Sequence, residues 1–380
     1  MTWVLYGATG FTGQLLAEQA LRRGHRPLLA GRSAPKLRAL AARLGLEWRA
    51  VAVDDAAGLR SLLTGRGAVL HAAGPFSATS AALADACLDV GTSYLDISGE
   101  LSTFEALFAR NEQAKRAGIA LIPGVGFDVV PSDCLAAQVS ARVQSADSLL
   151  IVLGSNADAR PSPGTIKSIV DVFATGGRVR RHGALVPLAF GRGAQRVPWS
   201  DHVGWCLPLP IADLVTAYHS TGVPNITVCM DVPNAVGSAA RVSWPLWAAG
   251  RAVLSWGLQL PLVRSQLQQL IDRTVQGPDE ATRARNRSHL YARASAKDGR
   301  AAEAWLTTAD GYTFTAESGV LAIERVLRDK PVGALSPSSA FGSDFAEQVT
   351  GTVVSFARRV VPPPSELPRE ATSVLGQSPH

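Results

Sequence analysis

Gly7-Ala8-Thr9-Gly10-Phe11-Thr12-Gly13 is a glycine-rich stretch between two segments of different character. Trp3-Val4-Leu5-Tyr6 before it is typical of a short buried strand, and residues 14–21 after it have the composition of a helix. Such glycines let the backbone approach a pyrophosphate, and the following helix N-terminus presents unpaired N–H groups. A strand–helix turn that binds nothing is the alternative, but the glycines would then cost stability without a purpose. We predict a dinucleotide site with contacts from Gly7, Thr9, Gly10, Phe11, Thr12 and Gly13.

The end of the second expected strand, residues 27–31, bears on the identity of the cofactor. It is followed by Arg32, at the place where an NAD-binding fold usually carries Asp or Glu to hold the ribose 2′-hydroxyl. No acid stands beside Arg32 in the sequence, and an arginine binds a 2′-phosphate that an acid would repel. A solvated loop arginine is the alternative; Lys36 suits a phosphate contact and a solvated position equally. The sequence predicts NADP(H), with further contacts from Ser33, Asp54, Ala73, Gly74 and Pro75.

Strands and helices alternate through the first 125 residues. The expected strands are residues 3–7, 27–31, 48–53, 68–72, 93–97 and 119–123, and the expected helices are residues 13–23, 34–44, 56–64, 78–90 and 101–117. This alternation is typical of a doubly wound parallel sheet. Small residues after the fourth strand would let a cofactor lie across the strand end. His71 lies inside that strand, where a packed histidine is the expected role.

The pattern changes after about residue 145, where antiparallel pairing is expected. The expected strands there are residues 149–153, 214–218, 226–230, 288–296 and 301–309, with Asp298-Gly299 as a hairpin turn. The expected helices are residues 132–143, 165–175, 313–329 and 340–357. The predicted class is therefore α/β, with a Rossmann-type doubly wound parallel sheet plus an α+β substrate domain that has a mainly antiparallel sheet.

This organisation predicts four parts of the chain. They are an NADP-binding Rossmann domain at 1–130, an α+β substrate and oligomerisation domain at 131–312, C-terminal helices that pack back on the Rossmann domain at 313–358, and a Pro/Ser-rich disordered tail at 361–380.

Composition narrows the functional class. The 380 residues are 47% hydrophobic and carry a net charge of +6, without a Lys/Arg block interleaved with aromatics, so no nucleic-acid partner is predicted. The four cysteines have no C-x-x-C spacing and the seven histidines no metal-ligand spacing, so we predict reduced thiols and no metal. The N-terminus begins directly with a strand, which predicts a cytoplasmic protein without a signal peptide.

Residues 244–260 are apolar and contain three tryptophans, but Arg251 interrupts them and prolines bracket them. The segment is too short and too interrupted for a transmembrane helix. A core or homodimer-interface helix is the favoured interpretation, and weak peripheral contact with a membrane or a wall of the substrate site is the alternative.

Several segments resemble the saccharopine dehydrogenase-like reductase family, and most closely its actinobacterial branch of trans-acting enoyl reductases. The matching residues are 7–13, 73–76, 87–100, 123–133, 220–225, 311–317 and 335–342, which span nearly the whole chain. Gly126-Phe127-Asp128 and Pro131-Ser132-Asp133 form the most specific part. The resemblance implies a Rossmann domain, an inserted substrate domain, NAD(P)-dependent hydride transfer, and as substrate an enoyl group on a small-molecule or carrier-bound polyketide or lipid intermediate.

No motif identifies the proton donor. None of the tyrosines has the lysine four residues later that a short-chain dehydrogenase needs, and no G-x-S-x-G elbow is present. Tyr94, Asp128 and Tyr218 are the candidate catalytic residues, by position near expected strand ends. A buried packing role is the alternative for each tyrosine, and capping of the helix at 132–143 is the alternative for Asp128, shared with Ser132. Glu100 suits either a ligand contact or a helix start.

Two other functions stay open at this point. One is an NADPH-dependent imine or ketone reductase, and the other is a non-catalytic NADP(H)-binding protein.

Overall fold

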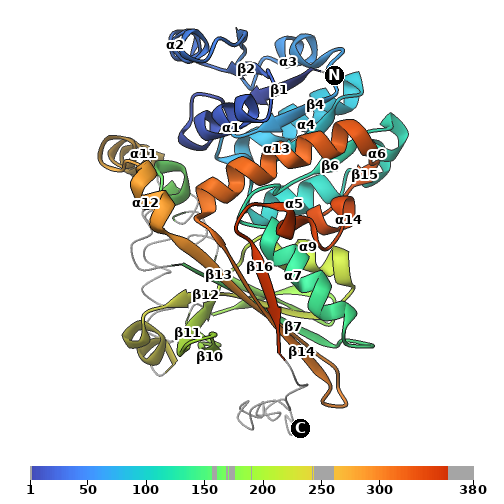
Figure 1. The fold of residues 1–380 in the computed structure, drawn as a ribbon, viewed down its shortest axis with the longest axis vertical. Helices are drawn as coiled ribbons and strands as arrows, with labels where there is room; N and C mark the ends of the chain where they lie inside the picture. The colour runs from blue at the N-terminus through green and yellow to red at the C-terminus, as the bar shows by residue number, and fades with distance from the viewer. Residues whose placement is uncertain are drawn as a thin grey trace, which may run out of the picture.

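Two β-sheets, joined by a shared hydrophobic core, organise the chain (Figure 1). The computed structural model describes residues 2–155, 161–167, 170, 176–189, 191–241, 243 and 261–357. The predicted tail, residues 244–260 and most of the helix expected at 165–175 lie outside the described residues.

The first sheet is parallel, in the order β15-β6-β5-β4-β1-β2-β3. Its strands are β1 (Trp3–Tyr6), β2 (Leu28–Gly31), β3 (Trp48–Ala50), β4 (Ala68–His71), β5 (Ser93–Asp96), β6 (Ala120–Ile122) and β15 (Gly333–Ala334). Strand β1 lies between β2 and β4, so β2 and β3 extend the sheet on one side of β1 and β4, β5 and β6 extend it on the other. The direction of winding therefore reverses between β1 and β4. In open α/β sheets a ligand binds at the carboxyl ends of the strands at such a point.

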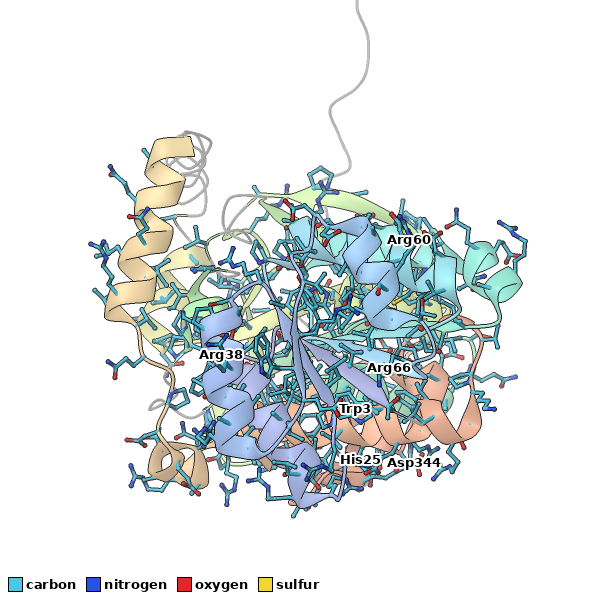
Figure 2. All side chains as sticks on the ribbon, turned by 90° about the horizontal axis from the view of Figure 1, so that it is seen from above. Trp3, His25, Arg38, Arg60, Arg66 and Asp344 are labelled. Atoms are coloured by element: carbon cyan, nitrogen blue, oxygen red, sulfur yellow. The ribbon has the colours of Figure 1, made fainter. Side chains whose placement is uncertain are left out.

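Helices cover both faces of the first sheet because its strands are apolar on both sides. Trp3 and Leu5 of β1 join the core under α1 (Phe11–Arg22), α2 (Ala34–Leu44) and α13 (Gly311–Asp329). Val4 and Tyr6 face the opposite core, under α3 (Ala56–Leu63), α4 (Phe76–Val90) and α6 (Asn111–Ala117). In the view from above, Arg38 on α2 and Arg60 on α3 accordingly lie on opposite sides of the sheet (Figure 2).

The second sheet is mainly antiparallel, in the order β10-β11-β12-β7-β13-β14-β16, and a β8–β9 hairpin adds to β12. Its strands are β7 (Ser148–Ser155), β8 (Gly177–Arg181), β9 (Ala184–Leu188), β10 (Gln195–Pro198), β11 (Val203–Pro208), β12 (Asn225–Val232), β13 (Arg287–Ser295), β14 (Ala301–Ala309) and β16 (Val353–Phe356). Only β7 and β12 pair in parallel among the described strands of this sheet. Helix α7 (Val130–Ala141) packs on it from the side of the first sheet. The predicted fold class is confirmed.

The strand expected at 214–218 is wrong, because these residues belong to helix α9 (Asp213–Thr221). The apolar run is too short for a period of two to be told from a period of 3.6. Packing of α9 against α7 and β12 decides the outcome, and Gly222 ends the helix at φ +69°.

The single helix expected at 340–357 is also wrong. This segment contains α14 (Pro337–Phe341), the 3₁₀ helix η1 (Phe345–Gln348) and β16, and β16 pairs with β14 of the second sheet. Gly342 and Gly351 adopt φ of +99° and +79°, conformations that interrupt a helix. The helix expected at 101–117 is likewise two helices, α5 (Leu101–Phe108) and α6.

Candidate functional site

The glycine-rich turn connects β1 to α1 at the point where the winding of the first sheet reverses. Gly7 has φ +86°, and a Cβ there would lie 2.6 Å from the Ala73 backbone nitrogen. A Cβ on Gly13 would lie 2.3 Å from the Gly7 carbonyl oxygen. Both glycines are therefore required for the close approach of the turn, the helix and the end of β4, whether or not a ligand is bound.

Gly10 is different, because nothing in the folded chain requires a glycine there. It is exposed, has φ −72°, and a Cβ would meet only the carbonyl oxygens of Gly7 at 3.4 Å and Ala72 at 3.9 Å. No side chain caps the N-terminus of α1, which begins at the next residue. Open space over uncapped N–H groups is what a bound pyrophosphate needs. Thr9 and Thr12 lie partly exposed in the same turn.

The predicted Phe11 contact is better explained by packing between domains. The Phe11 ring lies edge-on to the Tyr312 ring, with centroids 5.0 Å apart. Gly277 approaches so closely that a Cβ there would lie 2.5 Å from the Phe11 ring. The side chain thus anchors the glycine-rich turn to the segment before α12 (Glu280–Arg285) and to the start of α13, while its backbone N–H stays at the helix N-terminus.

Arg32 and Ser33 follow β2, and the exposed Asp54 follows β3. Burial raises the pKa of the Tyr6 hydroxyl, while the charge of Arg32 lowers it and that of Asp54 raises it, so both charges lie near the same end of β1. No acid is close to Arg32 in the sequence, but the fold brings Asp54 to the same end of β1. The expectation that no acid lies near Arg32 is therefore wrong in the folded protein. Arg32 is exposed, which leaves its guanidinium available to a 2′-phosphate, and the next residue, Ser33, makes no side-chain cap to α2.

Ala73, Gly74 and Pro75 lie partly or fully exposed between β4 and α4, beside the glycine-rich turn. The Glu100 carboxylate accepts hydrogen bonds from the N–H groups of Phe76 (2.9 Å) and Ser77 (2.7 Å). We expected Glu100 either to contact a ligand or to start a helix, and the structure shows the second role. The helix that its side chain caps is α4, and not α5, which follows Glu100 in the sequence. This carboxylate fills the α4 N-terminus and leaves the α1 N-terminus for a nucleotide.

Tyr94 is fully buried, which excludes contact with a substrate in this structure. Its hydroxyl lies 2.8 Å from Asp96 Oδ2 and 3.0 Å from His71 Nδ1. Burial raises the pKa of Tyr94 well above its usual value. The placement supports the packing alternative for Tyr94 and corrects the catalytic one.

Tyr218 also lies away from the strand ends, because it is on α9 rather than on a strand. The Arg180 guanidinium stacks over its ring at 4.2 Å, and Gly183 of the β8–β9 turn packs against its hydroxyl. This tyrosine holds the hairpin onto α9, and nothing in its position supports proton donation to a substrate.

Asp128 lies in the loop between β6 and α7, next to the chain that leaves β5. A Cβ on Gly99 would lie 3.1 Å from Asp128 Oδ2, so the carboxyl packs against that backbone. Water reaches Asp128, yet the surrounding protein raises the pKa of the carboxyl to about 6. Neither Asp128 nor Ser132 caps α7, and the Ser132 hydroxyl donates to the Val129 carbonyl instead (3.0 Å). With the capping role corrected, Asp128 is an accessible acid at the strand-end edge.

Asp213 is a buried acid that sequence reasoning missed. It is fully buried at the start of α9, and neither carboxylate oxygen has a hydrogen-bond partner among the described residues. Burial, with added repulsion from Asp133 and Asp128, raises its pKa to about 8. The spacing of Asp213, Thr216 and Ser220 places them on one face of a helix. Had residues 213–221 been predicted as a helix, this polar face would have indicated Asp213.

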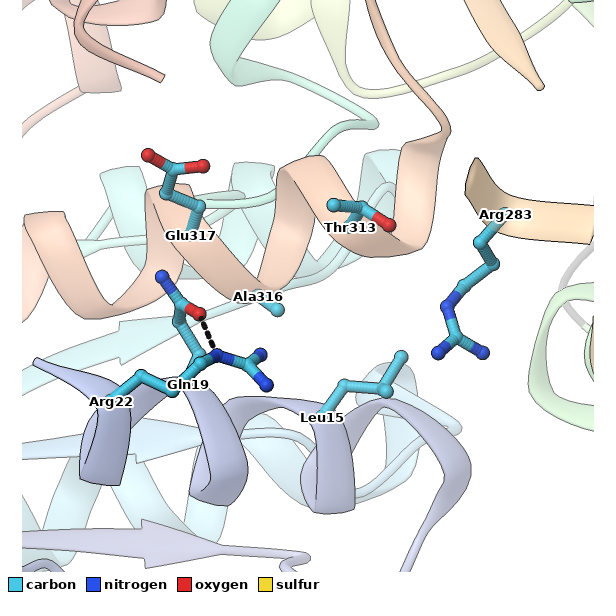
Figure 3. A pocket seen from close by; sticks show the side chains of 7 residues that line it. All are labelled: Leu15, Gln19, Arg22, Arg283, Thr313, Ala316 and Glu317. Carbon is cyan, nitrogen blue, oxygen red and sulfur yellow. Dashed lines mark hydrogen bonds between the residues drawn. The ribbon is translucent and has the colours of Figure 1, made fainter. Parts of the chain in front are cut away.

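A shallow pocket lies between α1 and α13 (Figure 3). It is lined by Leu15, Gln19, Arg22, Arg283, Thr313, Ala316 and Glu317. Arg22 Nε donates to Gln19 Oε1 at 2.8 Å, and Arg283 reaches in from α12. The pocket runs along α1 beyond its first turn, and it marks where the second domain meets the first.

Residues 3–122 match the family described as the saccharopine dehydrogenase NADP-binding domain. The N-terminal domain is thus similar to saccharopine dehydrogenase NADP-binding domains. Its cofactor is therefore a nicotinamide nucleotide, NADP(H), as the sequence predicted. The strand-end edge described above is the edge at which such a domain receives the nucleotide.

Curated relatives cover part of the chain. A trans-acting enoyl reductase from Mycobacterium ulcerans is 37% identical over 143 residues, which are 34% of this chain and 33% of that protein. A putative trans-acting enoyl reductase from Mycobacterium tuberculosis is 36% identical over 194 residues, 45% of this chain and 44% of that protein. The matches thus span between a third and a half of the length of these relatives.

A solved structure extends the comparison of the fold beyond the NADP-binding domain. Apo saccharopine dehydrogenase (L-Glu forming) from Saccharomyces cerevisiae has a TM-score of 0.63 at 13% identity, covering 94% of this chain and 99% of that one. At this identity the likeness establishes the fold, including the second sheet, and carries no substrate.

None of the described helices combines the length and the hydrophobicity needed to cross a bilayer. Among the described residues, no three His, Cys, Asp or Glu side chains gather as metal ligands would.

Arg32→Asp is expected to weaken NADPH binding by roughly 10- to 100-fold and to remove or reverse the preference over NADH, because a charge-assisted contact is worth about 1.5–3 kcal/mol. Fluorescence titration with both nucleotides measures this. Arg60→Asp on α3, across the sheet, is the matched control and should change neither affinity (Figure 2). Equal affinities for NADPH and NADH in the unaltered protein would contradict the assignment of Arg32.

Proposed function

We propose that the protein is an NADPH-dependent reductase that reduces the C=C bond of an enoyl group on a polyketide or lipid intermediate, acting in trans. The observation that carries the proposal is the 36–39% identity to curated trans-acting enoyl reductases over 143–153 residues. The matches cover only 33–35% of the length of these relatives, so the enoyl substrate is the proposed part.

The residues present fit the cofactor. Gly10 leaves open the space over the α1 N-terminus, and Arg32 extends a cation from the end of β2. The backbone at Ala73 lies against Gly7, so the end of β4 adjoins the same cradle. NADPH bound there would supply the hydride that adds to the β-carbon of the enoyl group.

The matching proton must reach the α-carbon, so that the C=C bond becomes a C–C single bond with one hydrogen added at each carbon. Asp128 is the residue we propose to supply it, because it is accessible, lies at the strand-end edge and has a raised pKa of about 6. A carboxyl with that pKa holds its proton below about pH 6 and delivers it readily near neutral pH. Neither Tyr94 nor Tyr218 is placed to do this.

We further propose a small-molecule or carrier-bound acyl thioester as the substrate, and the cytoplasm as the compartment. All four cysteines are free and buried, which supports a reducing environment. A net charge of +6 favours an approach by an acidic carrier domain. A homodimer remains the proposed assembly, and sedimentation analysis measures it.

NADPH consumption with an enoyl thioester, an imine and a ketone of similar chain length tests the proposal. We expect the enoyl thioester to be the fastest substrate. In Asp128→Asn, kcat should fall by roughly 10²- to 10⁴-fold, the usual contribution of a general acid. In the unaltered protein, kcat should fall as pH rises through about 6, because Asp128 then loses its proton.

Asp89→Asn, on the exposed end of α4, is the matched control and should keep full turnover. The affinity for NADPH should also survive Asp128→Asn, because Asp128 acts on the substrate side. Turnover of the imine or ketone with none of the enoyl thioester would replace the proposal by the alternative reductase. Tight NADPH binding without turnover of any of the three would support a non-catalytic binding protein.

A further inference from the structure

Three buried polar side chains form a chain beneath the end of β4. His71 Nε2 lies 3.1 Å from the Ala73 carbonyl oxygen, and His71 Nδ1 lies 3.0 Å from the Tyr94 hydroxyl. The Tyr94 hydroxyl lies 2.8 Å from Asp96 Oδ2. The other carboxylate oxygen, Asp96 Oδ1, accepts the N–H groups of Ser98 and Gly124, each at 2.9 Å. His71, Tyr94 and Asp96 are each completely inaccessible to water.

If Asp96 is ionised, the three side chains together have one hydrogen too few to make all of their hydrogen bonds. The Ala73 carbonyl is only an acceptor, so His71 Nε2 must carry its hydrogen. A neutral His71 then presents a lone pair at Nδ1, and an ionised Asp96 presents lone pairs at Oδ2. Tyr94 has a single hydroxyl hydrogen for both neighbours. One of the two short contacts would therefore bring lone pairs together in the core, which is costly.

We propose that His71, Tyr94 and Asp96 together hold one additional proton, and that this completed chain positions the Ala73 carbonyl at the nicotinamide end of the cofactor site. In the completed chain, protonated Asp96 donates to the Tyr94 oxygen. Tyr94 donates to His71 Nδ1, and His71 Nε2–H donates to Ala73. The positioning role rests on the proposed NADPH site, whereas the proton count does not.

The surroundings favour placing the proton on Asp96 rather than on His71. Burial raises the pKa of Asp96 to about 6, against the hydrogen bonds from Ser98, Gly124 and Tyr94 that lower it, and the nearby Glu100 carboxylate adds a smaller increase. Burial lowers the pKa of His71, which disfavours an imidazolium. The groups facing the chain from α4 are the Phe76 ring and the Cys87 thiol, which is itself kept neutral by burial. The ring of Tyr6 faces His71 from β1.

The chain acts on the cofactor site through the Ala73 carbonyl. That carbonyl accepts from His71 and also from the Thr79 hydroxyl at 2.8 Å. The Ala73 backbone lies so close to Gly7 that a Cβ on Gly7 would be 2.6 Å from the Ala73 nitrogen. The position of Ala73 therefore sets how the end of β4 meets the glycine-rich turn. Loss of the proton would weaken this hold, and the affinity for NADPH should fall as pH rises.

Asp96→Asn is the decisive variant, because asparagine is an isostere of the protonated acid. Its carboxamide oxygen can accept from Ser98 and Gly124, while its NH₂ group donates to the Tyr94 oxygen. We expect native far-UV circular dichroism and a thermal midpoint at alkaline pH equal to or above that of the unaltered protein. We also expect a dissociation constant for NADPH that no longer rises with pH.

Glu100→Gln is the matched control, since it is the same acid-to-amide change in the same neighbourhood. Both oxygens of Glu100 accept from backbone N–H groups that cannot accept in return, so an amide must lose one bond. Its thermal midpoint should fall. An equal fall in Asp96→Asn would overturn the proposal, because Asp96 would then be an ordinary ionised acceptor.

Nitrogen NMR of ¹⁵N-histidine-labelled protein gives a second test on the unaltered chain without cofactor. Below about pH 6, where Asp96 keeps its proton, His71 should be a neutral Nε2–H tautomer whose Nδ1 accepts a hydrogen bond. A His71 Nδ1 without a donor in that pH range would overturn the shared proton even if Asp96→Asn failed to fold. The thermal midpoint of Asp96→Asn and the NMR signals of His71 do not depend on turnover. A protein that fails to reduce an enoyl thioester could therefore still give the results expected for the shared proton, so failure of one proposal can be told from failure of the other.

Discussion

Gly10→Val is expected to reduce NADPH affinity by at least roughly 100-fold while the fold stays intact. A valine at Gly10 would place its branched side chain in the space over the uncapped α1 N-terminus, where the pyrophosphate must approach. The folded chain itself accepts a side chain there, since φ is −72° and no atom lies closer than 3.4 Å to the added Cβ. Titration of NADPH fluorescence and urea unfolding of the same preparations measure the two effects.

Gly13→Val is the informative comparison, because this variant should lose both NADPH affinity and stability. Its Cβ would lie 2.3 Å from the Gly7 carbonyl oxygen, and α1 would have to move away from β1. We expect a loss of stability of about 2–4 kcal/mol, in the range of a severe clash in a packed core, together with the loss of binding. Undiminished NADPH affinity in Gly10→Val would show that the nucleotide lies elsewhere.

Asp213→Asn is expected to stabilise the protein at alkaline pH by about 1–4 kcal/mol. The pKa of Asp213 is raised from 3.8 to about 8, so the folded protein holds this proton more tightly than the unfolded chain does. Stability from this group is complete below the unfolded pKa near 4 and is lost as pH rises toward 8. A pKa raised from 3.8 to about 8 corresponds to at most roughly 5 kcal/mol of folding free energy. Relaxation of the protein around the carboxylate reduces this figure.

Asparagine cannot ionise, so the advantage of Asp213→Asn should be small near pH 5 and largest above about pH 8. Urea unfolding at both pH values measures it. Asp344→Asn, an exposed residue before η1, is the control and should show no gain that depends on pH. A destabilising effect of Asp213→Asn at alkaline pH would mean that Asp213 is an ionised acceptor with a partner after all.

Local sequence was sufficient for the NADP-binding domain. The turn from Gly7 to Gly13 and the alternation of strands and helices depend on neighbours within one βαβ unit. The expected boundaries agree with the structure to within a few residues, apart from the helix expected at 101–117, which is two helices. Arg32 could be assigned from its distance after the glycines, because that spacing determines which strand end it occupies. The same locality explains the Asp298-Gly299 hairpin between β13 and β14.

Tertiary packing decided what local patterns left ambiguous. The run at 214–218 became a helix because α7 and β12 offer it a surface to cover, and residues 353–356 became a strand because β14 offers an open edge. Glu100 caps α4 from 23 residues further along the chain, a contact that no short window contains. Tyr94 and Tyr218 suited a catalytic role by position alone, and only their burial and partners removed them from it.

By itself, therefore, the amino-acid sequence determined the six strands of the parallel sheet up to β6 and the NADP(H) class, and it predicts the nucleotide cradle, since each depends on residues close together in the chain. The seventh strand, β15, comes from far along the chain and was not expected. The tertiary structure decided which acids matter. The raised pKa of Asp213 and the proton shared by His71, Tyr94 and Asp96 as we propose it arise from burial among residues distant in sequence, whereas Asp128 is left exposed at the edge of the first sheet. Burial changes the cost of a charge by removing water from it, and only the assembled core specifies where water is removed.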